Sequence, residues 1–82
     1  MDKNAILEVV KGLLISEFKV NSESIELEKR LDEDLDLDSL DLVDLIIALE
    51  DHIGEKVDLS PFKDVETLGD VIDLLAPLWN AA

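Results

Sequence analysis

Ser39 has the side chain whose chemistry is best defined by its surroundings. It lies in the segment Asp34–Glu50, DLDLDSLDLVDLIIALE, where alternating acids and leucines change to the spacing of an amphipathic helix. Asp38 is a good helix N-cap, and Asp41 three positions later can complete an approximate capping box. Free backbone N–H groups and the helix dipole favour a phosphate at such a position. Most serines at helix starts are caps alone, but this one is also placed to carry a phosphate ester.

Enzymatic chemistry at Ser39 has no support in the sequence. His52 is the only histidine, and it lies thirteen residues beyond Ser39 on the same expected helix, about 20 Å away at 1.5 Å per residue. No base of this chain is therefore near enough to activate the hydroxyl. The three glycines are scattered, so nucleotide binding by a glycine-rich phosphate loop has no support either. No catalytic residue is assigned.

The acids ahead of Ser39 match only part of an EF-hand calcium loop. Asp32, Asp34 and Asp36 occupy its first three acidic positions. Leu37 then stands where the loop needs a glycine, and Val43 stands where it needs a bidentate glutamate. These two mismatches exclude an EF-hand, and no residue is assigned as a metal ligand.

Three amphipathic helices are expected to position Ser39, because apolar residues recur at three- and four-residue spacing. The expected helices are residues 3–18, capped by Asp2 or Asn4; residues 39–52 or 39–53, ended by Gly54; and a last helix capped by Thr67 and stopped or kinked by Pro77. The residues expected in the core are Ile6, Leu7, Val10, Leu13, Leu14 and Phe18 of the first helix, Leu42, Ile46, Leu49 and Ile53 of the second, and Leu68, Val71, Ile72 and Leu75 of the last.

A fourth, short helix is expected where Ser60 acts as a cap and Pro61 takes the first helical position, ending at about Lys63. The fold class is therefore an all-α, small antiparallel four-helix bundle of three main helices and one short helix, forming a single domain over residues 1–82. A long loop joins the first two helices, and Ile25, Leu27 and Leu31 pin it to the core, with Leu37 as a further core residue.

The second helix has an outer stripe that a purely solvated face would not need. Leu40, Asp44, Ile47 and Asp51 lie together on nearly the opposite side from the core residues. One interpretation is that Leu40 and Ile47 are single exposed apolar residues, which are normal on a protein surface. The alternative interpretation is that they are the apolar anchors of a docking face surrounded by acids. Because no lysine or arginine occurs between Leu31 and Glu55, partners should present basic, partly apolar surfaces.

The charge of the chain is strongly negative. Seven basic against 21 acidic residues give a formal net charge of −14, which argues against nucleic acid and anionic membranes as partners. Disorder is unexpected because 48% of the residues are hydrophobic and fall in helical register. There is no cysteine and no apolar run near the ~20 residues of a membrane span. We expect a cytoplasmic monomer without membrane insertion.

The segment around Ser39 resembles the 4'-phosphopantetheine attachment segment of acyl carrier proteins. The resemblance rests on Asp38-Ser39-Leu40 with the Asp41, Val43, Leu45 and Ala48–Glu50 that follow, and it extends over almost the whole chain. It implies that a separate phosphopantetheinyl transferase, the holo-synthase, esterifies Ser39, and that the terminal thiol of the arm holds an acyl group for partner enzymes of fatty acid, lipid or polyketide biosynthesis. It also implies cofactor contacts at Asp38 and Leu40. The implied partner-binding residues are Asp38, Leu40, Asp41, Asp44, Ile47, Glu50 and Asp51.

Two positions depart from the usual pattern of that family. A glycine and then a small residue commonly precede Asp-Ser-Leu, whereas this chain has Asp36 and Leu37. The departure favours a specialised pathway over housekeeping fatty acid synthesis. A D-alanyl, aminoacyl, peptidyl or polyketide carrier remains an alternative. From a different class, an unmodified acidic helical adaptor would fit the composition equally well.

Overall fold

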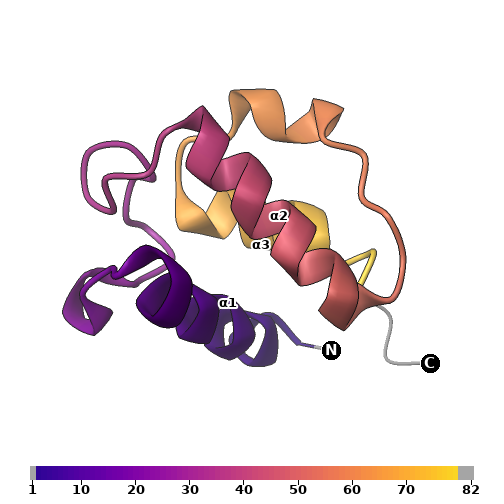
Figure 1. Ribbon diagram of the computed structural model, residues 1–82, viewed down its shortest axis with the longest axis horizontal. Helices are drawn as coiled ribbons and strands as arrows, with labels where there is room; N and C mark the ends of the chain where they lie inside the picture. The colour runs from indigo at the N-terminus through magenta and orange to yellow at the C-terminus, as the bar shows by residue number, and fades with distance from the viewer. Residues whose placement is uncertain (1, 80–82) are drawn as a thin grey trace.

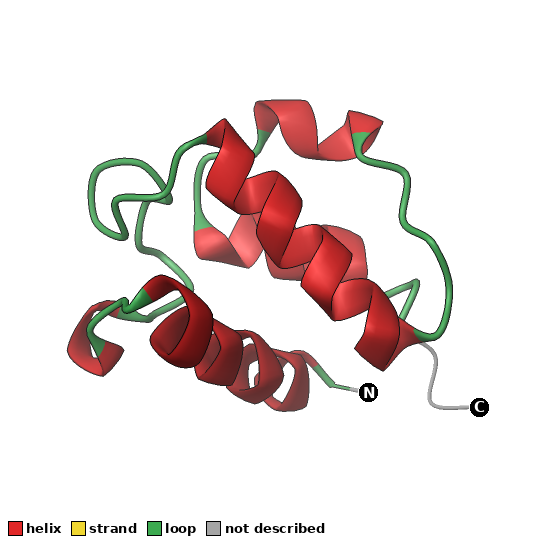
Figure 2. Ribbon diagram, in the orientation of Figure 1, coloured by secondary structure: helices red, strands yellow, loops and turns green. Residues whose placement is uncertain are grey.

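The computed structural model describes residues 2–79, and these residues form helices and the segments that join them. The α-helices are α1 (Lys3–Phe18), α2 (Ser39–Ile53) and α3 (Leu68–Leu75), and two 3-10 helices are η1 (Ser22–Ser24) and η2 (Ser60–Asp64). Within residues 2–79 the only β-type pairing is one isolated bridge between Arg30 and Thr67. Figure 2 shows the helices and the loops that join them.

The helices do not all alternate in direction. Figure 1 shows α1 running opposite to α2, as expected for an antiparallel arrangement, whereas α3 runs in the same direction as α2. The reason is the long connection between α2 and α3, which carries η2 and returns the chain along the length of α2. Helix α1 contacts both α2 and α3, and α3 contacts η2.

Helix α1 has the predicted bounds. Of the two expected caps, Asp2 is the one used, because its Oδ1 accepts a hydrogen bond from Ala5 N at 2.8 Å. The helix ends where Lys19 takes the left-handed conformation, with φ 60°, and Val20 N donates to Leu14 O at 3.0 Å. The buried side chains of α1 are Ile6, Val10 and Leu14, and its partly buried core residues include Leu7, Leu13 and Phe18.

Helix α2 confirms the prediction at both ends, and its buried face is wider than predicted. Ser39 is its first residue, and Gly54 ends it in the left-handed conformation with φ 92°. Ile46 and Leu49 are fully buried, as expected, but Leu45 is fully buried too, although it was not predicted in the core. Conversely, Leu42 and Ile53 are only partly buried, because Leu42 lines an open cavity and Ile53 lies in the last turn.

Helix α3 begins at the predicted cap and ends two residues before Pro77. All four predicted core residues of this helix are fully buried: Leu68, Val71, Ile72 and Leu75. Trp79, for which no role was predicted, is 5% exposed. Its ring stacks on His52 with ring centroids 6.3 Å apart, so the end of the described chain packs against the end of α2.

The short helix η2 differs from the expected one in type and in cap. It is a 3-10 helix over Ser60–Asp64, and Ser60 lies inside it instead of capping it. The local acceptor is Asp58, whose Oδ1 accepts a hydrogen bond from Ser60 N at 3.0 Å. Phe62 is 5% exposed and anchors η2 to the core.

Backbone hydrogen bonds join the loop between α1 and α2 to the start of α3. Leu31 N donates to Glu66 O at 2.9 Å, Leu68 N donates to Lys29 O at 3.0 Å, and Gly69 N donates to Leu27 O at 2.8 Å. A Cβ atom on Gly69 would lie only 3.0 Å from Leu27 O, so the close approach requires glycine. Burial of Ile25, Leu31, Leu35 and Leu37 pins the rest of this loop.

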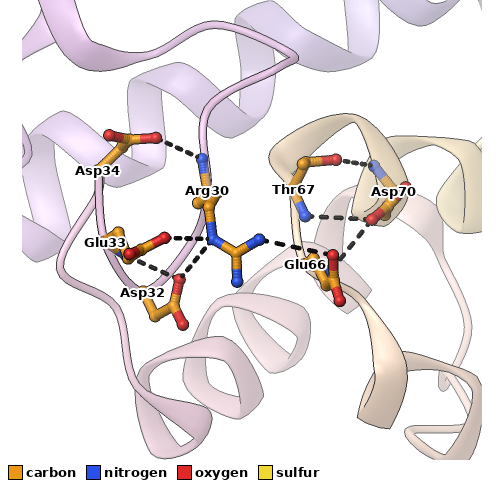
Figure 3. A network of polar contacts seen from close by, with 7 residues as sticks. All are labelled: Arg30, Asp32, Glu33, Asp34, Glu66, Thr67 and Asp70. Carbon is orange, nitrogen blue, oxygen red and sulfur yellow. Dashed lines mark hydrogen bonds and ion pairs between the residues drawn. The ribbon is translucent and has the colours of Figure 1, made fainter.

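Arg30 is the centre of a polar network at the same junction (Figure 3). Its Nε lies 2.6 Å from Glu33 Oε2 and 3.4 Å from Asp32 Oδ1, and its Nη1 lies 3.5 Å from Glu66 Oε2. The three acids raise the pKa of Arg30, Asp32 most strongly. The backbone N–H of Glu33 and then the charge of Arg30 lower the pKa of Asp32. The network therefore joins the loop to the segment that enters α3.

Candidate functional site

Ser39 is an exposed residue that follows the buried Leu37 by two positions and precedes the exposed Leu40. Just ahead of it, Leu37 is 5% exposed and its N–H donates to Leu31 O at 2.8 Å, which confirms the prediction that Leu37 is a core residue. Asp36 takes the left-handed conformation, with φ 56°, to turn the chain into this anchor. Residues other than glycine rarely adopt that backbone conformation. The chain thus turns sharply, is anchored by Leu37, and presents Ser39 at the surface.

The predicted capping box is present at the start of α2. Asp38 Oδ1 accepts a hydrogen bond from Asp41 N at 2.9 Å, and Asp41 Oδ2 accepts one from Asp38 N at 3.2 Å. Within residues 2–79, the amides of Ser39 and Leu40 donate to no acceptor. The first turn of α2 therefore offers two free backbone donors next to the Ser39 hydroxyl.

An open cavity of about 500 Å³ adjoins Ser39. The sequence did not predict it, because its walls come from three separate parts of the chain. Its apolar wall consists of Leu31, Leu37, Leu42, Val43, Ile46, Leu59, Phe62 and Val65, and its charged lining residues are Arg30, Asp32, Asp38, Lys63 and Glu66. An exposed hydroxyl beside free amides and an apolar cavity fits a serine that carries a long, covalently attached group.

The predicted docking stripe of α2 is exposed. Leu40 is 73% exposed and Ile47 is 52% exposed, and both Asp44 and Asp51 are exposed as well. The predicted orientation of α2 is confirmed, because the stripe faces outward while Ile46 is fully buried.

Three of the acids predicted to contact partners already have backbone partners within the chain. Asp38 and Asp41 each use one carboxylate oxygen in the capping box. Glu50 Oε2 accepts a hydrogen bond from Val57 N at 2.8 Å, which ties the segment after α2 back to the helix. This role of Glu50 was not predicted, because nothing in the spacing of the sequence indicates a bond over seven residues.

His52 is in the last turn of α2, away from Ser39, and stacks on Trp79. Within residues 2–79, no group of three or more histidine, cysteine, aspartate or glutamate side chains is placed to hold a metal ion. None of the helices in this part of the chain combines the length and apolarity needed to cross a bilayer.

Comparison with known proteins identifies the family of this small helical domain. Residues 8–75 match the family described as "Phosphopantetheine attachment site". The chain is 41% identical over 78 residues to the "Acyl carrier protein" of Saccharopolyspora erythraea, covering 95% of this chain and 82% of the relative. It is 37% identical over 81 residues to "Acyl carrier protein 2" of Ralstonia nicotianae, covering 99% of this chain and 100% of the relative. It is 36% identical over 75 residues to the "Acyl carrier protein" of Thermosynechococcus vestitus, covering 92% and 93%.

The chain belongs to the acyl carrier protein family. Its cofactor is 4'-phosphopantetheine, held covalently. The chain itself has no cysteine and therefore no thiol of its own.

Proposed function

We propose that Ser39 is the attachment residue and that this protein carries acyl groups as thioesters on the arm that Ser39 holds. The observation that carries the proposal is the placement of an exposed Ser39 hydroxyl at the start of α2, beside two free amides and an apolar cavity, inside the matched residues 8–75. The other described serines lack this placement: Ser16, Ser22, Ser24 and Ser60 do not follow an Asp in an Asp-Ser-Leu sequence at an α-helix start.

The residues around Ser39 have distinct parts in this function. The Ser39 oxygen forms the phosphodiester link, and when attached the arm supplies a thiol for acyl transfer. Asp38 and Leu40 flank the link, with Asp38 holding the helix start through the capping box. Within residues 2–79 no histidine lies beside Ser39, since His52 is in the last turn of α2. Attachment would therefore need a separate phosphopantetheinyl transferase, and the chain itself would act as carrier and not as enzyme.

We propose that the exposed stripe of α2 is the docking surface for that transferase and for acyl-transfer and acyl-modifying enzymes. Its apolar residues Leu40 and Ile47 are 73% and 52% exposed, and acids surround them. The partners would contribute basic residues. The proposed contact residues are those predicted from the resemblance: Asp38, Leu40, Asp41, Asp44, Ile47, Glu50 and Asp51.

Residues 1–82 would act as one domain, a four-helix bundle in which η2 takes the place of the short helix, working as a cytoplasmic monomer. The pathway would be a specialised one of fatty acid, lipid or polyketide biosynthesis. The left-handed conformation of Asp36, with φ 56°, is one that suits glycine, so the departure from the usual residue leaves the backbone route into α2 intact. A D-alanyl, aminoacyl or peptidyl cargo would be recognised by its mass on the arm.

The decisive experiment compares Ser39→Ala with Ser60→Ala. Ser60 is an exposed serine at the start of η2 and is the matched control. Each protein is incubated with coenzyme A and a broad-specificity phosphopantetheinyl transferase, and its intact mass is measured. Wild type and Ser60→Ala should gain one phosphopantetheine group, and Ser39→Ala should gain none. Modification of the Ser39→Ala variant would contradict the proposed site.

Intact mass of the protein from its native host then tests the carrier function. We expect wild type to bear phosphopantetheine and, in part, an acyl group whose mass names the cargo. A protein that is never modified in its host would instead support the unmodified acidic adaptor.

A further inference from the structure

The cavity beside Ser39 has two cations among its lining residues, Arg30 and Lys63. They matter because the surroundings of Ser39 are strongly acidic, with no lysine or arginine between Leu31 and Glu55. A phosphodiester formed on Ser39 adds a further negative charge in this region. It would lie next to the carboxylates of Asp38 and Asp41.

The two cations differ in whether they are engaged. Arg30 lies within 3.5 Å of carboxylate oxygens on Asp32, Glu33 and Glu66, so its charge is already opposed by three acids. Lys63 forms no ion pair within residues 2–79. Among the described residues that line the cavity, its ammonium group is therefore the available cation.

The position of Lys63 is held by its neighbours in η2. Phe62, the preceding residue, is 5% exposed and lines the same cavity, and its N–H donates to Leu59 O at 3.0 Å. Pro61 restricts the backbone at the start of this helix. The backbone of Lys63 is thus fixed beside the cavity, while its long side chain with three N–H donors stays exposed and adaptable.

We propose that Lys63 binds the phosphodiester group attached to Ser39, and so orients the first part of the arm along the cavity. The inference rests on the proposed attachment at Ser39. A flexible ammonium group recognises a phosphate oxygen as a point charge and needs no bidentate geometry. The contact offsets part of the repulsion between the phosphodiester and the neighbouring acids. Lys63 is a positioning residue in this scheme and takes no part in acyl transfer.

The test uses the modified protein and phosphorus NMR, which observes the phosphodiester directly. The variants are Lys63→Met, which keeps a long apolar stem without the charge, and Lys63→Arg, which keeps the charge. Lys56→Met is the matched control, because Lys56 is also exposed after α2 but does not line the cavity. Intact mass confirms attachment before each spectrum, and an amide spectrum confirms that each variant is folded.

Lys63→Met should shift the phosphorus resonance and narrow its line, because the group becomes more mobile. Lys63→Arg should restore the wild-type spectrum, and Lys56→Met should leave it unchanged. At about 1 M salt, where the Debye length is about 3 Å, the wild-type resonance should move to the Lys63→Met position while the resonance of that variant barely moves.

Each outcome separates this inference from the proposed function. A phosphodiester that is attached but has the same resonance and line width in wild type and Lys63→Met overturns the role of Lys63 and leaves the attachment site standing. A Lys56→Met spectrum as altered as that of Lys63→Met also overturns it, since the effect would then be one of net charge alone. Absence of any phosphopantetheine on Ser39 overturns both.

Discussion

The starts of α2 and α3 use the same capping device in opposite environments. In α2, Asp38 and Asp41 exchange side-chain and backbone hydrogen bonds at 2.9 and 3.2 Å. In α3, Thr67 and Asp70 do the same at 3.2 and 3.1 Å. The local sequence pattern of a small polar cap and an acid three residues later is therefore equivalent at the two sites.

The next residues of the two helices are covered very differently. Leu68, the first residue of α3, is fully buried, and its amide and that of Gly69 donate to carbonyls of the loop between α1 and α2. Leu40, the second residue of α2, is 73% exposed, and the amides of Ser39 and Leu40 donate to nothing in residues 2–79. The loop that closes the start of α3 leaves the start of α2 open.

A capping box therefore specifies where a helix begins but not how the amides of its first turn are satisfied. The free amides of a first turn are satisfied by the fold in one case and remain available to a ligand in the other. The packing of distant segments, and not the local motif, decides whether these amides are satisfied within the fold.

The largest expected effect comes from truncating the leucines that distinguish the two starts. Leu68→Ala should lower the free energy of unfolding by about 2 to 5 kcal/mol, because it leaves a cavity in the core. Leu40→Ala should change it by no more than about 0.5 kcal/mol, because the side chain is exposed. Urea unfolding followed by circular dichroism measures both. Similar losses in the two variants would show that the start of α2 is covered after all.

The next effect concerns the open side, where partners are expected to dock. Ile47→Ala should raise the dissociation rate of a phosphopantetheinyl transferase about tenfold, and Asp44→Lys should mainly slow association. Ile15→Ala is the control, since Ile15 is 42% exposed but lies on α1. Surface plasmon resonance at increasing salt should show slower association, because the Debye length is already only about 8 Å at physiological salt. Association rates that do not change with salt concentration would contradict an electrostatic docking face.

A smaller effect is expected at the turn that leads into α2. Asp36→Gly removes left-handed strain of about 1 kcal/mol but adds a comparable entropy to the unfolded chain, so the net gain in stability should be below about 1 kcal/mol. It also removes one charge from an acidic region, so added salt should raise the melting temperature less than in wild type.

Lys19→Gly is the matched variant for that turn, because Lys19 has nearly the same left-handed φ of 60° but a positive charge. Removal of the Lys19 charge makes the net charge of the protein more negative. Added salt should then raise the melting temperature of this variant more than that of wild type. If the two variants respond equally to salt, repulsion around Asp36 is not significant.

The smallest effect is expected in the pH dependence of the free energy of unfolding that arises at the start of α3. The backbone N–H groups of Glu66 and Thr67 lower the pKa of Asp70. The folded state therefore favours the carboxylate: this contribution to stability is complete above the ordinary aspartate value, near 4, and is lost as the pH falls through the lowered value. Asp70→Asn should lack this loss, whereas Asp51→Asn, on the exposed stripe, should keep it. Unfolding curves between neutral and acid pH measure the difference, and equal slopes for wild type and Asp70→Asn would contradict it.

The helices and the place of Ser39 at the start of α2 were predictable because they depend on local patterns. Asp38, Ser39 and Gly54 mark their roles in α2 through residue type and position alone. The spacing of Ile46 and Ile47 was sufficient to separate a buried from an exposed face. Helical periodicity and capping need only neighbours within one or two turns, so a single sequence carries them.

What could not be predicted depends on contacts between distant segments. The hydrogen bond from Gly69 to Leu27, the bond from Val57 to Glu50 and the burial of Trp79 all arise from tertiary packing. The cavity is a product of the same packing, since Leu42 lines it with residues from the loop and η2. Lys63 therefore gave no signal in the sequence, where it is one charged residue in a short helix.

The stack of Trp79 on His52 gives this protein a built-in optical reporter. The chain has one tryptophan and no tyrosine, so its intrinsic fluorescence comes almost entirely from a single site. That site is at the end of α2 opposite Ser39, about 20 Å along the helix at 1.5 Å per residue. Emission should follow the detachment of the C-terminal segment from α2 and should not respond to events at Ser39. Fluorescence can therefore measure the folding of the loaded and unloaded protein on one common scale.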